Sequence, residues 1–298
     1  MPAFWHYYVA ILTIIFVIWC AWLIGWSAKQ GPQDVSDDDL VGHKWDGDLE
    51  EWNNPAPKWW LYLYFITIAW GLGFLLAMPG LGNFPGLLGW SSTGQYDAEV
   101  AAATERYEPI YERFAAMPFE ELTRQPEANQ LGASLYASYC TTCHGSDARG
   151  ATGFPNLVDD DWLWGSSEEQ IVYTIKNGRN GIMPDLSAAL GGDEGIDNMV
   201  SYVRSLSGLV EADAGAQSAQ PMFVALCSAC HMPDGTGNTM LGAPNLTDDV
   251  WLYNSSEEMV RDIIVNGRNN MMPAHGDLLG ENRTKILAAY VASLSADE

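Results

Sequence analysis

The pentapeptide CTTCH at residues 140–144 and its counterpart CSACH at residues 227–231 share the pattern Cys-x-x-Cys-His, 87 residues apart. This pattern is the attachment signal for c-type haem. Its two thiols bond covalently to the porphyrin edge, and the adjacent histidine then faces the iron from one side. The sequence therefore predicts two covalently attached haem c groups. Their predicted ligands in these motifs are Cys140, Cys143, His144, Cys227, Cys230 and His231.

Zinc is the main alternative for paired Cys-x-x-Cys motifs, but each zinc site would need further Cys or His ligands. The chain has five cysteines, and the motifs use four of them. The remaining histidines, His6, His43 and His275, are too few and too scattered to close two zinc sites. The fifth cysteine, Cys20, lies in an apolar run and is expected to be a buried or lipid-facing residue. The sequence therefore favours haem over zinc and predicts no disulfide framework.

Each motif begins one copy of a longer repeat. Residues 155–184 align without gaps to residues 244–273, and 18 of these 30 positions are identical. In both copies a Ser-Ser-Glu-Glu stretch predicts the start of a helix, because serine caps a helix and glutamate is favourable in its first turn. We expect one structural unit built twice, at residues 129–210 and 216–298.

Both units are predicted to be helical, because no segment shows convincing strand alternation. The order within each unit is an N-terminal helix, the haem motif, a middle helix, a Met-bearing loop and a C-terminal helix. This order resembles the class I cytochrome c fold. The predicted fold class is all-α, with two N-terminal transmembrane helices followed by two tandem class I cytochrome c domains.

Methionines at matching repeat positions are candidates for the second axial ligand of each iron. Met183 stands in Gly-Ile-Met-Pro and Met272 in Met-Met-Pro. A haem bound by His and Met is suited to electron transfer without binding small ligands. Each Met lies far enough beyond its own motif to loop round the ring, so we hypothesise His/Met ligation within each repeat. Met271 and His275 are alternatives in the second repeat.

Two further pairs of residues are repeated around the motifs. Pro155 and Pro244 either accept a hydrogen bond from the haem histidine through their carbonyl groups, as in cytochromes c, or simply form turns. Arg179 and Arg268 either neutralise haem propionates or are solvated charges in loops. The sequence leaves both questions open.

Two uncharged runs, residues 7–26 and 59–79, are each long enough to cross the ~30 Å hydrocarbon layer as a helix. We expect membrane spans at residues 1–28 and 58–80, a loop at 29–57 and a connector at 81–128. Lys29, Lys44 and Lys58 lie between the two runs, whereas no Lys or Arg precedes the first and Arg106 is the next after the second. The positive-inside rule therefore predicts a cytoplasmic loop and periplasmic haem domains.

The formal net charge of the chain is −24. Such a charge argues against nucleic acid or an anionic membrane surface as a partner, and it would attract a basic protein. The same charge also serves solubility, so it names no partner by itself.

The segment GHKWDGDLEEWNNP at residues 42–55, with PKWW at 57–60 and NFPG at 83–86, resembles the N-terminal signature of the dihaem subunit III (CcoP or FixP) of cbb3-type cytochrome c oxidases. With the haem repeats, the resemblance covers nearly the whole chain. It implies a two-pass protein of the bacterial inner membrane that takes electrons from a periplasmic donor cytochrome c. Its two haems would relay them towards a monohaem subunit and the haem-copper subunit that reduces oxygen and pumps protons.

The resemblance implies that this chain carries electrons within an oxidase and has no catalytic residue of its own. The alternative is a stand-alone, membrane-anchored dihaem cytochrome c that carries electrons between other complexes. The haem repeats fit both functions, and the signature at residues 42–55 favours the oxidase subunit.

Overall fold

The computed structural model of this chain describes residues 2–29, 40–52 and 57–295. The chain forms two compact units, Met1–Glu105 and Arg106–Glu298. The last part of the family signature, residues 53–55, lies outside the described residues.

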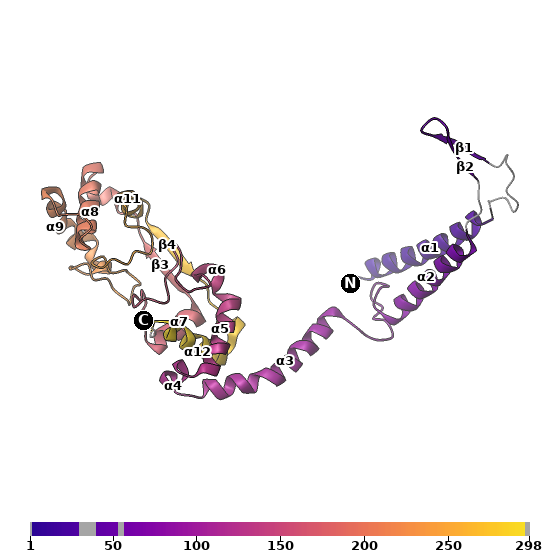
Figure 1. Cartoon of the computed structure of the whole chain (residues 1–298), viewed down its shortest axis with the longest axis horizontal. Helices are drawn as coiled ribbons and strands as arrows, with labels where there is room; N and C mark the ends of the chain where they lie inside the picture. The colour runs from indigo at the N-terminus through magenta and orange to yellow at the C-terminus, as the bar shows by residue number, and fades with distance from the viewer. Residues whose placement is uncertain (1, 30–39, 53–56, 296–298) are drawn as a thin grey trace. The chain divides into compact units, whose positions relative to one another are not determined.

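In the first unit, helices α1 (Ala3–Ser27) and α2 (Lys58–Ala77) lie side by side (Figure 1). Within the described part of the chain, these two helices are long and apolar enough to cross a membrane. The backbone N–H of Asn83 donates to Nδ1 of His6 over 2.8 Å, which ties the turn after α2 to the start of α1. The two predicted spans are therefore helical, with boundaries a few residues from those predicted.

Strands β1 (Leu40–Trp45) and β2 (Leu49–Trp52) form an antiparallel hairpin between these helices. The all-α prediction is wrong here. Asp46 and Gly47 both have positive φ, at 54° and 94°, in the turn. An Asp-Gly pair favours such a hairpin turn because both residues tolerate this conformation.

The second unit is mainly helical. The chain enters this unit within helix α3 (Ser92–Ala115). The elements after α3 follow in chain order: α4 (Phe119–Thr123), α5 (Pro126–Tyr139), α6 (Thr141–His144), α7 (Glu168–Asn177), β3 (Arg179–Met183), the 3₁₀ helix η1 (Ser187–Leu190), α8 (Asp193–Leu206), α9 (Ala214–Leu226), α10 (Ser228–His231), α11 (Glu257–Asn266), β4 (Arg268–Met272) and α12 (Gly276–Leu294). The predicted capping serines are confirmed, because the hydroxyl groups of Ser167 and Ser256 accept hydrogen bonds from the first turns of α7 and α11.

The two repeats exchange their C-terminal helices. Helix α12, from the second repeat, packs against α5 and α7 of the first, whereas α8, from the first repeat, packs against α9 and α11 of the second (Figure 1). The repeats at residues 129–210 and 216–298 therefore do not pack as two separate units, because each contributes its C-terminal helix to the other. Only residues 207–213 separate α8 from α9. A connection this short favours packing of the two helices it joins, which leaves α5 to be covered by α12.

Two separate hydrophobic cores result from this exchange. The first contains Leu135 and Tyr136 of α5 with Leu287 and Val291 of α12. The second is built in the same way from α8, α9 and α11, and it contains Met199 and Tyr202 of α8 with Phe223 of α9.

Strands β3 and β4 join the repeats by an antiparallel ladder that pairs Arg179 with Met272 and Met183 with Arg268. These two strands were not predicted from the sequence. They are five residues each, and their alternation of half-buried and exposed residues is too short to stand out from a loop.

Candidate haem sites

Each Cys-x-x-Cys-His motif forms a single helical turn directly after the N-terminal helix of its repeat. Cys140 and Cys227 are half-buried at the ends of α5 and α9, while Cys143 and Cys230 are exposed. Burial, with a smaller contribution from the neighbouring thiol, raises the pKa of Cys140 and of Cys227 to about 11. The two inner thiols are therefore neutral near pH ~7 in the protein without haem.

The motif histidines are buried and oriented. His144 and His231 are each only 9% exposed. Nδ1 of His144 lies 2.9 Å from the carbonyl oxygen of Pro155, and Nδ1 of His231 lies 3.0 Å from that of Pro244. A carbonyl oxygen can only accept, so each Nδ1 carries the proton and each Nε2 keeps its lone pair for a metal. The prolines thus do more than form turns.

Burial also affects the protonation of the second motif histidine. It lowers the pKa of His231, and the hydrogen bond to the carbonyl of Pro244 opposes this effect only in part. A neutral imidazole results, which is the form that binds a metal.

The candidate axial methionines are exchanged between the repeats, as the helices are. Met183 packs against the core that contains Cys227, and Met272 packs against the core that contains Cys140. The packing therefore differs from the expectation that each Met loops back to the motif of its own repeat. The ladder between β3 and β4 carries each Met across to the other half of the unit.

Met271 and His275, the alternative ligands in the second repeat, lie in different surroundings from Met272. Met271 is 75% exposed, because it stands on the outer face of β4 next to Met272. Nδ1 of His275 lies 2.9 Å from the carbonyl oxygen of Pro273, whereas Met272 packs against the core with Cys140. Met272 is therefore the better candidate.

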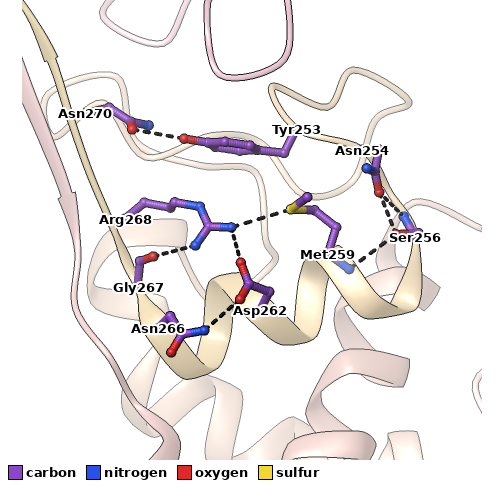
Figure 2. A network of polar contacts seen from close by, with 9 residues as sticks. All are labelled: Tyr253, Asn254, Ser256, Met259, Asp262, Asn266, Gly267, Arg268 and Asn270. Carbon is purple, nitrogen blue, oxygen red and sulfur yellow. Dashed lines mark hydrogen bonds and ion pairs between the residues drawn. The ribbon is translucent and has the colours of Figure 1, made fainter.

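Arg179 and Arg268 are both half-buried and hydrogen-bonded, unlike free solvated charges. The guanidinium of Arg268 lies above the ring of Tyr253 and pairs with Asp262 of α11 (Figure 2). The guanidinium of Arg179 lies against the rings of Trp164 and Tyr173. Sequence reasoning missed these partners, since only the repeat alignment, with Tyr173 at the position of Asp262, could have pointed to them.

The residues present fit haem c better than a bare metal ion. Within the described residues, His, Cys, Asp and Glu side chains form no cluster of three or more that could hold an ion directly. The buried indole N–H of Trp251 has no acceptor among the described residues, and this side chain packs in the core beside Cys227 and Met183. A haem propionate is an acceptor that such a donor would suit.

Comparisons with known proteins identify the family of the chain. Residues 37–85 match the family described as N-terminal domain of cytochrome oxidase-cbb3, FixP. Residues 127–203 and 214–291 match the family described as cytochrome c oxidase, cbb3-type, subunit III.

Relatives of similar length also match the chain. The cbb3-type cytochrome c oxidase subunit CcoP of Rubrivivax gelatinosus is 42% identical over 291 residues, which cover 98% of this chain and 95% of the relative. The cbb3-type subunit FixP of Azorhizobium caulinodans is 37% identical over 275 residues, which cover 87% of this chain and 93% of the relative. The subunit CcoP of Rhodobacter capsulatus is 34% identical, with coverage of 87% and 96%.

Proposed function

The chain belongs to the family of subunit III of cbb3-type cytochrome c oxidase, and from this premise we propose that it carries electrons into the oxidase through two haem c groups. The observation that carries the proposal is the repeated buried histidine. In both motifs Nδ1 is held by a proline carbonyl and Nε2 is left for a metal. This arrangement suits an iron that changes its charge without changing its ligands.

Each haem would be held by residues from both repeats. Cys140, Cys143 and His144 would hold the first haem, with Met272 on its far face. Cys227, Cys230 and His231 would hold the second, with Met183 on its far face. A haem iron with His and Met ligands takes up and gives away a single electron. The proline carbonyl orients the histidine ring, and each Met would be held by the hydrophobic core against which it packs.

Helices α1 and α2 would anchor the chain in the bacterial inner membrane, with the hairpin β1–β2 on the cytoplasmic side and Arg106–Glu298 in the periplasm. The lysines between the helices support this orientation. A basic periplasmic cytochrome c would deliver electrons, attracted by the net charge of −24. A monohaem subunit and a haem-copper catalytic subunit, which reduces oxygen and pumps protons, would receive them.

Purification of the tagged chain from gently solubilised membranes tests this function. Co-purification of haem b and copper is expected, together with two haem c per chain that stay with the polypeptide after denaturation and extraction with acidic acetone. Cys140→Ser/Cys143→Ser should lose one of the two. A dihaem chain that purifies without copper would instead be a stand-alone carrier.

The exchanged ligands can be tested in variants that keep one haem. Cys227→Ser/Cys230→Ser leaves only the site at His144, and the far-red band of Fe–S(Met) then reports that site alone. In this background, Met272→Ala should abolish the band and Met183→Ala should leave it in place. The reverse pattern would show ligation within each repeat.

A further inference from the structure

Arg179 and Arg268 occupy the same position in the two repeats, at the start of β3 and of β4. In the ladder, Arg179 lies opposite Met272, and Arg268 lies opposite Met183. Residues directly opposite each other in an antiparallel pair project from the same face. Both arginines and both candidate axial methionines therefore lie on one face of the ribbon, and each arginine stands directly opposite one methionine.

The packing assigns each arginine to one haem site. The Arg179 guanidinium bonds to side chains of α7, a helix whose Ile171 and Ile175 belong to the core with Cys140. The Arg268 guanidinium bonds to α11, which contributes buried residues to the core with Cys227. Arg179 thus belongs with the first site and Arg268 with the second. Met272, opposite Arg179, and Met183, opposite Arg268, are assigned to the same two sites.

The charge of Arg268 is compensated. Nη2 of Arg268 lies 2.5 Å from Oδ2 of Asp262, one turn before the end of α11, and 3.4 Å from the sulfur of Met259 (Figure 2). Asn266 also donates to this carboxylate (Figure 2). The two hydrogen bonds lower the pKa of Asp262, with that from Arg268 the larger cause. Asp262 is therefore ionised at neutral pH, and the pair has little net charge.

The charge of Arg179 is not compensated. In the first repeat, Tyr173 stands at the position of Asp262. The Arg179 guanidinium lies 4.4 Å from the Tyr173 ring centroid, and it donates to Oε1 of Gln170 over 2.6 Å and to Oγ1 of Thr174 over 2.8 Å. These partners are neutral, and within the described residues no carboxylate pairs with Arg179. A full positive charge is thus held half-buried at the first site only.

We propose that this difference sets the two haems at unequal reduction potentials. Arg179 favours the reduced form of the haem on Cys140 and Cys143, while Asp262 cancels most of the same effect of Arg268 on the haem at Cys227 and Cys230. A nearby positive charge favours the state with one more electron. Electrons then run downhill from the second haem to the first. This inference rests on the proposed function, since it requires both haems.

The expected size follows from electrostatics. A unit charge about 10 Å away, at an effective dielectric constant of about 20, changes a one-electron equilibrium roughly tenfold. A tenfold change corresponds to about 59 mV for one electron.

Reductive titration of the purified oxidase, followed by c-type haem absorbance, tests the proposal. The components of this chain's two haems are distinguished from that of the monohaem subunit by their loss in Cys140→Ser/Cys143→Ser and in Cys227→Ser/Cys230→Ser. Arg179→Gln should lower the component of higher potential, and Asp262→Asn should raise the other, each by roughly tenfold in the ratio of reduced to oxidised haem. Tyr173→Asp keeps Arg179 and supplies the missing carboxylate, so it should lower the higher component as well. The double variant Arg268→Gln/Asp262→Asn removes both charges and should leave the lower component near its original potential.

Two outcomes would overturn the inference while both haems remain attached: Arg179→Gln and Asp262→Asn shift the same component, or neither variant shifts any. Equal potentials of this chain's two haems in the wild-type complex would be a third. A wild-type chain that holds fewer than two covalently attached haems would instead contradict the proposed function itself.

Discussion

The ring of Tyr290, near the end of the chain, packs against that of Tyr136, four residues before the first motif, with centroids 5.8 Å apart and planes at 57°. The matching pair in the other core is Tyr202 against Phe223, at 5.3 Å and 59°. Both pairs join residues of different repeats. The core beside each haem motif therefore depends on a helix that the sequence assigns to the other repeat.

The exchange predicts that a mutation in the second repeat damages the first haem site. Tyr290→Ala removes most of a side chain that packs on α5, and we expect it to lower the free energy of unfolding by about 2–3 kcal/mol. It should also weaken Met ligation at the haem on Cys140 more than at the other. Denaturant unfolding and the far-red Fe–S(Met) band measure these effects.

Leu278→Ala on α12 is the matched control, because this side chain is 63% exposed. We expect it to change stability little. An equal loss in the two variants, or damage confined to the second haem, would contradict the exchange of helices.

Gly132 on α5 allows the close approach of α12. A Cβ added at this residue would lie 2.3 Å from Cβ of Tyr290 and 3.3 Å from the carbonyl oxygen of Ile286. Gly132→Ala should therefore cost about 1–3 kcal/mol through overpacking, even though alanine gains up to about 1 kcal/mol in helix propensity. Thermal unfolding of the variant measures the balance.

Ser134→Ala, an exposed site on the same helix, reports the gain in propensity without the clash. It should be neutral or slightly stabilising. A Gly132→Ala variant that is as stable as Ser134→Ala would show that α5 and α12 can separate without loss.

Adjacent methionines on β4 should differ sharply. Met271 points outward and Met272 packs in the core with Cys140. Met272→Ala is expected to lower the potential of one haem, because Met ligation raises it, whereas Met271→Ala should leave both potentials unchanged. Spectroelectrochemistry of the two variants measures the reduction potentials of the haems. A shifted potential in Met271→Ala alone would show that Met271, and not Met272, is the ligand.

The local features of both sites could be predicted from sequence because they depend on neighbouring residues. Ser167 caps α7 and Ser256 caps α11 through their own hydroxyl groups. The contacts of Pro155 and Pro244 with the motif histidines span only 11 and 13 residues. Capping chemistry therefore suffices for the two helix starts, whereas the role of the prolines stayed open in the sequence and is decided by their contacts in the structure.

The exchange of helices could not be predicted in this way. Helices α8 and α12 have nearly the same apolar pattern, with Tyr202 matching Tyr290, so either would fit on α5 or α9. The length of the connection from α8 to α9 decides between the two arrangements, and a search for repeats does not weigh it. The pairing of Arg268 with Asp262 could not be predicted either, because the two repeats differ at the position of Asp262, where the first repeat has Tyr173.

Acidic residues between the two motif loops predict a dependence of stability on pH. Burial is the main cause that raises the pKa of Asp248; the hydrogen bond from the backbone N–H of Val250 opposes it, and the carboxyl group of Asp161 adds to the increase. The folded state therefore binds the proton of Asp248 more tightly than the unfolded state does. The stabilisation from this group is complete below its unfolded pKa of about 4 and is lost as pH rises through the folded value.

Asp248→Asn should therefore stabilise the protein near pH ~7 by less than about 1 kcal/mol, since the site is partly solvated. The amide oxygen can still accept from the N–H of Val250, now 3.1 Å from Oδ1. The gain should shrink as pH falls and vanish below pH ~4, where the wild-type carboxyl group is itself neutral. Urea unfolding at both pH values measures it, with the exposed neighbour Asp249→Asn as control. A gain of the same size at both pH values would show that the substitution acts through packing and not through the charge of Asp248.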